Sequence, residues 1–190
     1  MGTVPRFGEN GLVARITKGF MTQNPSTVKG IGNDSSVINN IDRLTLVSTD
    51  MLLEGIHFDL TYFPLKHLGY KCVIRAISDI YAMNGNPNQL LVGIGASSRF
   101  QAEAIEEIYV GIKMGCEKYG VDLVGGDITG SLTGLAITVT AVGSVENESL
   151  VTREGARVND LICVTGDLGG AYIGLQILER EKKIFEKNSG

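Results

Sequence analysis

Apolar residues recur every three or four positions in four stretches of the chain, which is the spacing that lines one face of a helix. In the first stretch these residues are Leu12, Ile16 and Phe20, and the third includes Ile108 and Ile112. The pattern predicts helices over residues 8–20, 66–84, 101–119 and 171–183.

Between the predicted helices lie shorter runs rich in β-branched residues, which are typical of strands. The longest run alternates apolar and polar side chains, as expected for a strand with two different faces. Strands are predicted over residues 35–39, 44–49, 89–96, 121–124, 135–145 and 161–165, with a loop over 21–30. This alternation of elements predicts an α/β (α+β) fold with a parallel or mixed sheet.

A polar stretch at residues 146–149 divides these elements into two unequal parts. Residues 1–150 are predicted to form one domain. Residues 151–190 hold one predicted strand and one helix, which cannot bury a core by themselves. We therefore expect residues 151–190 to be the beginning of a truncated second α/β domain.

Composition and charge narrow the class of protein. The chain is 43% apolar and 20% charged, so it can bury a core. A net charge of −4 gives no basic surface for nucleic acid or an anionic membrane. The three isolated cysteines indicate reduced thiols in a cytoplasmic protein. Neither a signal peptide nor an apolar run of transmembrane length is visible.

Five aspartates stand beside glycine turns, at strand ends or on a helix, where α/β proteins often carry their sites. They are Asp34, Asp50, Asp79, Asp127 and Asp167. Crowded carboxylates repel one another unless one is protonated or a cation joins them. Oxygen ligands with almost no histidine or cysteine nearby suit Mg²⁺ rather than zinc. The aspartates therefore point to chemistry on a phosphate.

In two motifs the aspartate can be explained either as a metal ligand or by a structural role. LVSTD ends a predicted strand with Ser48, Thr49 and Asp50, which can share a metal ion or simply cap the strand. Asp79 lies within an otherwise apolar helix, where an unpaired carboxylate is costly. We favour a metal ligand at Asp79, and the alternative is an ion pair with Arg75, one helical turn before it.

Three further motifs are glycine turns. In VGGDIT, Gly126 opens space, and Asp127 and Thr129 supply oxygens that can face a metal ion or a phosphate. In GIGND, taken alone, a glycine turn with a side-chain cap explains Asp34 better than a site does. In VTGDLGG the free amides of a helix start can hold a phosphate, but a plain helix start explains Asp167 equally well. P-loop and protein-kinase signatures are absent, and no residue is assigned as catalytic.

Taken in order, five segments resemble one known family: GIGNDSSVI, LVSTDMLLEGIHFD, LGYKCVIRAISDIYAMNGNP, YGVDLVGGDIT and TREGARVNDLICVTGDLG. The chain is similar to thiamine-monophosphate kinase, within the superfamily of aminoimidazole ribonucleotide synthetase, over nearly its whole length. The resemblance implies ATP-dependent phosphorylation of thiamine monophosphate to thiamine diphosphate, with several Mg²⁺ ions. It also implies a mixed β-sheet covered by helices on one face, and a homodimer formed across the sheets. Residues 1–150 would then be the domain that binds ATP and Mg²⁺ and dimerises.

The resemblance assigns site residues position by position. The implied metal ligands are Asp34, Ser48, Thr49, Asp50, Asp79 and Asp127. The implied ATP contacts are Tyr109, Gly126, Asp127 and Arg153, and His57 would contact the thiamine phosphate. Without the resemblance, these residues have simpler explanations. A lone histidine such as His57 and a helix tyrosine such as Tyr109 are more often structural, and an arginine such as Arg153 is more often a surface residue.

Departures from the family pattern affect the metal sites. Asn33 stands where the family usually has an aspartate, and Arg75 stands where it usually has an asparagine. Arg75 is expected to pair with Asp79 and weaken metal binding there. Because the family's second domain is nearly absent, we expect little turnover from this chain alone. The acceptor phosphate is already ionised, so direct in-line transfer needs no general base.

Two other interpretations remain open. One is another enzyme of the same superfamily: a ribonucleotide synthetase, a selenophosphate synthetase or a hydrogenase-maturation protein. The other is a non-catalytic dimerisation module that keeps the sheet interface. Stabilisation by Mg²⁺ with an ATP analogue, with and without thiamine monophosphate, distinguishes a formed site from such a module.

Overall fold

The computed structural model describes residues 8–29, 31, 37–152 and 154–188. In chain order its elements are α1 (Gly8–Ile16), β1 (Thr27–Lys29), β2 (Val37–Ile38), β3 (Leu44–Leu53), α2 (Leu65–Ala82), β4 (Asn86–Ala96), α3 (Ala102–Tyr119), β5 (Asp122–Gly130), β6 (Leu135–Val145), a 3₁₀ turn (Asn147–Ser149) and α4 (Gly170–Asn188). Asp34 and Arg153, which were predicted as site residues, fall outside the described residues, and so does Asn33.

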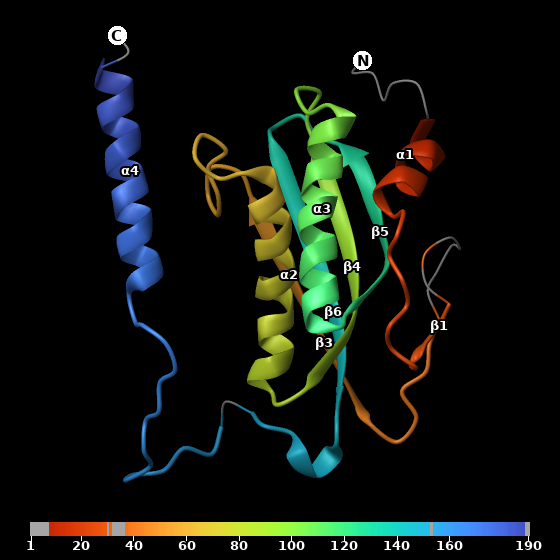
Figure 1. Cartoon of the computed structure of the whole chain (residues 1–190). Helices are drawn as coiled ribbons and strands as arrows, with labels where there is room; N and C mark the ends of the chain where they lie inside the picture. The colour runs from red at the N-terminus through yellow and green to blue at the C-terminus, as the bar shows by residue number, and fades with distance from the viewer. Residues whose placement is uncertain (1–7, 30, 32–36, 153, 189–190) are drawn as a thin grey trace.

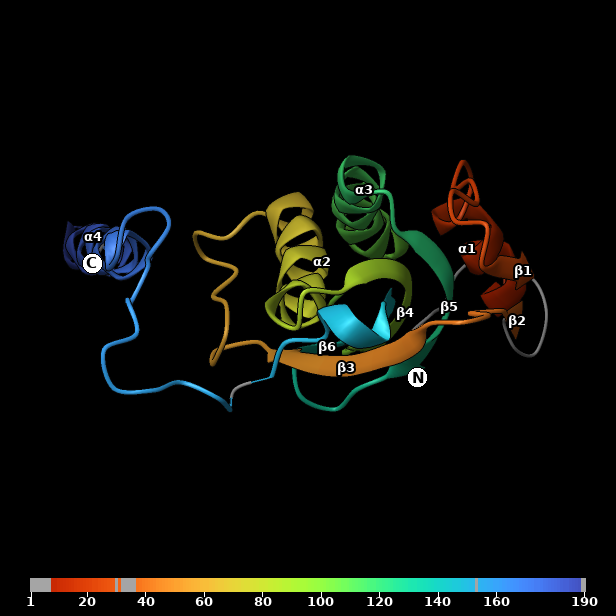
Figure 2. The ribbon, with the colours of Figure 1, turned by 90° about the horizontal axis from the view of Figure 1, so that it is seen from below.

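Four of the strands form one mixed sheet in the order β3-β6-β4-β5. Strand β6 is antiparallel to both β3 and β4, whereas β4 and β5 are parallel and are joined through α3. Figure 2 shows α2 and α3 on one side of this sheet. The predicted mixed sheet with helices on one face is confirmed, and β1 and β2 add a separate two-stranded ribbon.

The core lies between the sheet and helices α2 and α3, and these helices pack closely against each other. A Cβ at Gly69 would lie 1.9 Å from the carbonyl oxygen of Ile108, and a Cβ at Gly111 would lie 1.9 Å from that of Lys66. Glycines are therefore required at both positions, because any side chain would force the helix backbones apart.

Within the described residues, the other face of the sheet carries no helix. Along β3 the even-numbered residues face the helices and the odd-numbered residues face away, as the pleat requires. Val47 and Met51 are 67% and 53% exposed on this open face, whereas Leu52 on the helix side is fully buried. The sheet therefore presents apolar side chains that the described part of the chain leaves uncovered.

The polypeptide beyond β6 differs from its prediction. Residues 161–165 were predicted to form a strand, and this is wrong, because they have no extended partner to pair with. Leu161 and Ile162 are 90% and 95% exposed. Residues 27–29, predicted as loop, form β1. The division at residue 150 into two domains stays a prediction.

Helix α4 lies to the side of the sheet-and-helix domain (Figure 1). Two side-chain contacts join it to the loop between β3 and α2. The hydroxyl of Tyr62 donates to Glu179 at 2.7 Å, and the ammonium of Lys182 lies 2.5 Å from a carboxylate oxygen of Asp59. In the described residues, none of the helices is both long enough and apolar enough to span a bilayer.

Candidate functional site

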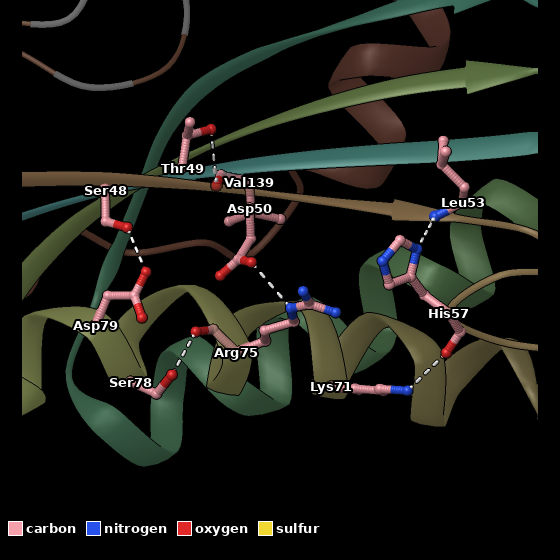
Figure 3. A network of polar contacts seen from close by, with 10 residues as sticks. All are labelled: Ser48, Thr49, Asp50, Leu53, His57, Lys71, Arg75, Ser78, Asp79 and Val139. Carbon is pink, nitrogen blue, oxygen red and sulfur yellow. Dashed lines mark hydrogen bonds and ion pairs between the residues drawn. The ribbon is translucent and has the colours of Figure 1, made fainter.

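Three of the predicted ligands come together in the space between β3 and α2, as Figure 3 shows. Ser48 and Asp50 are two residues apart on β3, so the strand pleat points both toward the helix. Asp79 lies on α2, and the Ser48 hydroxyl donates a hydrogen bond of 2.5 Å to its carboxylate. We refer to Ser48, Asp50, Arg75 and Asp79 as the β3–α2 cluster.

Arg75 provides the positive charge of this cluster. Its Nε donates to Oδ1 of Asp50 at 2.9 Å, across the gap between α2 and β3. The expected pair between Arg75 and Asp79 on the same helix is therefore wrong, because the guanidinium reaches the strand instead. The Asp50 side chain is 16% exposed and that of Arg75 is 40% exposed, so the ion pair is partly shielded from water.

Thr49 and Asp127 lie on the opposite face of the sheet. The Thr49 hydroxyl contacts Thr140 at 3.1 Å, and Figure 3 shows it on the other side of β3 from Ser48 and Asp50. Asp127 is exposed. In the register of the sheet it pairs with Gly93, Gly93 pairs with Thr138, and Thr138 pairs with Met51, so Asp127 faces the same side of the sheet as Met51. Strands β6 and β4 separate Asp127 from β3, which places it about 14 Å from that strand.

The predicted ligands within the described residues therefore lie on two different faces of the sheet. Within the described residues, no three acidic, histidine or cysteine side chains are close enough to hold a metal ion. The chemistry of the donors fits Mg²⁺, because they are hydroxyl and carboxylate oxygens. Their arrangement does not give a single site containing Ser48, Thr49, Asp50, Asp79 and Asp127.

The two other described residues assigned to ATP have structural explanations. A Cβ at Gly126 would lie 1.9 Å from the carbonyl oxygen of Val92, so the close approach of β4 alone requires glycine there. Tyr109 is 5% exposed on the core side of α3, and burial raises the pKa of its hydroxyl to about 12. Both assignments as ATP contacts stay predictions.

His57 lies in the loop after β3. Its Nδ1 accepts a hydrogen bond from the backbone N–H of Leu53 at 3.0 Å, and its carbonyl accepts one from Lys71 at 2.9 Å (Figure 3). The residue borders a groove of about 650 Å³ whose other walls include Phe63 and the α4 residue Tyr172. This groove is open to a small molecule, so contact of His57 with the thiamine phosphate remains a prediction.

Sequence reasoning missed Asp122, a structurally important carboxylate. It is 3% exposed and accepts hydrogen bonds from the backbone N–H groups of Gln23 and Asn24 at 2.5 and 3.0 Å. The Thr27 hydroxyl adds a third at 2.6 Å. Asp122 thus ties the segment before β1 to the start of β5. An aspartate inside the apolar run VDLV was the available signal.

Comparison with known proteins adds to this geometry. Residues 32–145, more than half of the chain, match the family described as AIR synthase related protein, N-terminal domain. The chain belongs to this family. The match spans β2 to β6 and therefore includes the whole four-stranded sheet with α2 and α3.

Curated relatives include thiamine-monophosphate kinases. The protein from Aquifex aeolicus (strain VF5) is 35% identical over 94% of this chain, and the one from Bacillus subtilis (strain 168) is 34% identical over 80%. The chain spans about half the length of these relatives, covering 55% and 47% of them. The solved structure of AaThiL complexed with AMPPCP and TMP is 32% identical, with a TM-score of 0.69, over 94% of this chain and 55% of that one.

Proposed function

We propose that this chain is part of an enzyme that uses ATP to phosphorylate thiamine monophosphate to thiamine diphosphate. The observation that carries the proposal is the similarity to AaThiL, a structure that holds AMPPCP and TMP together. AMPPCP is a non-hydrolysable analogue of ATP, so that protein accommodates a nucleotide and a thiamine phosphate at the same time. The curated relatives named thiamine-monophosphate kinase support the same reaction.

The reaction asks for the positioning of two anionic substrates. The acceptor is a phosphate oxygen that is ionised at neutral pH, so no side chain has to remove a proton from it. The protein must hold donor and acceptor in line and offset their charge, which is most of the work in phosphoryl transfer. We propose direct transfer without a phosphorylated enzyme, and a phosphorylated side chain trapped during turnover would contradict this.

Mg²⁺ enters this proposal with the nucleotide. In nucleotide sites Mg²⁺ is bound by one or two carboxylates together with phosphate oxygens, rather than by a cage made of protein alone. Asp79 and Ser48 are the oxygen donors of the β3–α2 cluster that carry no cationic partner in the described residues. When bound there, the ion would neutralise phosphate charge. Asp127 and Thr49 lie on the other face of the sheet, so they would not bind this ion.

The open sheet face supports the predicted homodimer. Val47, Met51 and the 36% exposed Leu53 form an apolar surface on β3, the edge strand of the sheet. A second copy of the chain would cover this surface with an equivalent one. Sedimentation velocity should show a dimer for the wild type and a monomer for Met51→Lys, whereas Met114→Lys on α3 should remain dimeric. A monomeric wild type would contradict this part of the proposal.

A thermal shift experiment tests the nucleotide site. AMPPCP with Mg²⁺ should raise the melting temperature, and thiamine monophosphate should raise it further, whereas thiamine without its phosphate should add much less. At a ligand concentration of 100 times Kd, binding stabilises the folded state by about 2.7 kcal/mol. Absence of any shift with AMPPCP, in a chain that still dimerises, would instead support the non-catalytic module.

A further inference from the structure

The Asp50 carboxylate already has a cation, and this cation belongs to the protein. Arg75 Nε lies 2.9 Å from Asp50 Oδ1, and the Asp50 side chain is 16% exposed (Figure 3). A carboxylate so far removed from water is costly unless a positive charge accompanies it. Arginine stays protonated at every accessible pH, so this compensation does not depend on any dissolved ion.

We propose that Arg75 holds the place that a divalent cation would otherwise take at Asp50. This inference rests on the proposed function and deepens it, because it lowers by one the number of metal ions that the chain needs for the proposed reaction. Asp50 would then be a residue that anchors a guanidinium rather than a metal ligand. The remaining donors of the cluster, Ser48 and Asp79, bond to each other and not to Arg75.

Two physical reasons support exclusion of a metal ion. A Mg²⁺ ion must approach its oxygen ligands to about 2.0–2.1 Å, and the bonded side of Oδ1 is occupied by the Arg75 N–H. An ion on the same carboxylate would also stand beside the fixed positive charge of the guanidinium. That repulsion is strong where the pair is partly shielded from solvent.

The pairing is selective within the cluster. Arg75 and Asp79 stand four positions apart on α2, the spacing of an ordinary intrahelical ion pair. The guanidinium nevertheless crosses to β3, while Asp79 accepts the Ser48 hydroxyl. Lys71, one turn earlier on α2, donates to the carbonyl of His57 instead of to a carboxylate. Among the described residues, Arg75 is therefore the cation bonded to Asp50.

Binding of Mn²⁺ to the full chain without nucleotide tests the proposal, with electron paramagnetic resonance measuring the free ion. Mn²⁺ shares the preference of Mg²⁺ for oxygen ligands. The wild type and Asp50→Asn should bind Mn²⁺ equally. Arg75→Gln should gain a site at least about tenfold tighter, and the double variant with Asp50→Asn should lose it again. Lys71→Gln, which removes a neighbouring positive charge, should behave as the wild type.

Two results would overturn the proposal. One is weaker Mn²⁺ binding in Asp50→Asn than in the wild type, which would show a metal ion on Asp50 in the presence of Arg75. The other is a folded Arg75→Gln chain, checked by circular dichroism, that binds Mn²⁺ no better than the wild type. Should Arg75→Gln fail to fold, the first comparison still decides. Since no nucleotide is present, failure of the proposed kinase activity is a separate result.

Discussion

Replacing Gly111 with alanine tests the close packing of α2 and α3, on which the position of the β3–α2 cluster depends. The new Cβ would lie 1.9 Å from the carbonyl oxygen of Lys66, whereas such contacts are essentially never shorter than 3.0 Å. The two backbones would have to separate by about 1 Å, which close-packed interiors resist. Because a backbone carbonyl cannot rotate out of the way, the cost should reach about 3 kcal/mol.

Part of this cost is offset, because alanine favours helix over glycine by about 1 kcal/mol. The net loss of unfolding free energy should be about 2 kcal/mol. With a urea dependence of about 2 kcal/mol per molar for a protein of this size, the unfolding midpoint should fall by about 1 M. Circular dichroism during urea unfolding measures this midpoint.

Gly174→Ala on α4 is the matched control, because a Cβ there meets nothing within 4 Å. It makes the same chemical change within a helix, and the midpoint should stay the same or rise slightly. A Gly111→Ala midpoint within about 0.2 M of the wild type would refute the packing argument.

Three further predictions follow from other contacts. Only Cys163 should react quickly with Ellman's reagent in the folded chain, because the other two cysteines are buried and burial raises the pKa of each to about 12; three fast thiols would contradict this. Asp122→Ala should lower the unfolding free energy by about 3 kcal/mol through loss of three hydrogen bonds to a carboxylate, whereas exposed Asp160→Ala should change it by less than about 0.5 kcal/mol. Hydrogen bonds from Lys182 and Thr61 lower the pKa of Asp59 from 3.8 to about 2. The contact of Asp59 with α4 is therefore complete above pH 3.8 and is lost as the pH falls toward 2. The protection of α4 amides against hydrogen exchange should fall over that range in the wild type, and not in Asp59→Asn.

Local patterns were sufficient to predict the long elements. Helix α3 was predicted over 101–119 and is found at Ala102–Tyr119, because its apolar stripe and the closing Gly120 are both local signals. Strand β6 was predicted with the bounds it has, Leu135–Val145, since alternation over so many residues fits little else. The predicted strand over 161–165 failed because its apolar residues lack the partner that a strand needs.

The candidate site depended on information that local patterns do not hold. Ser48 and Asp79 meet as expected, but the face on which Asp127 lies follows from the strand order and from its register with Gly93. The partner of Arg75 could not be read from helical spacing, because the competing carboxylate belongs to a strand that is distant in sequence. Tertiary pairing, rather than propensity, decided both points.

The central claim is that the β3–α2 cluster holds the phosphates of ATP through a Mg²⁺ ion on Asp79. Calorimetric titration with AMPPCP in the presence of Mg²⁺ tests this claim most directly. The wild type should bind the analogue, Asp79→Asn should bind it at least about tenfold more weakly, and Asp160→Asn should match the wild type. Equal affinity for AMPPCP in the wild type and in a folded Asp79→Asn variant would contradict the account.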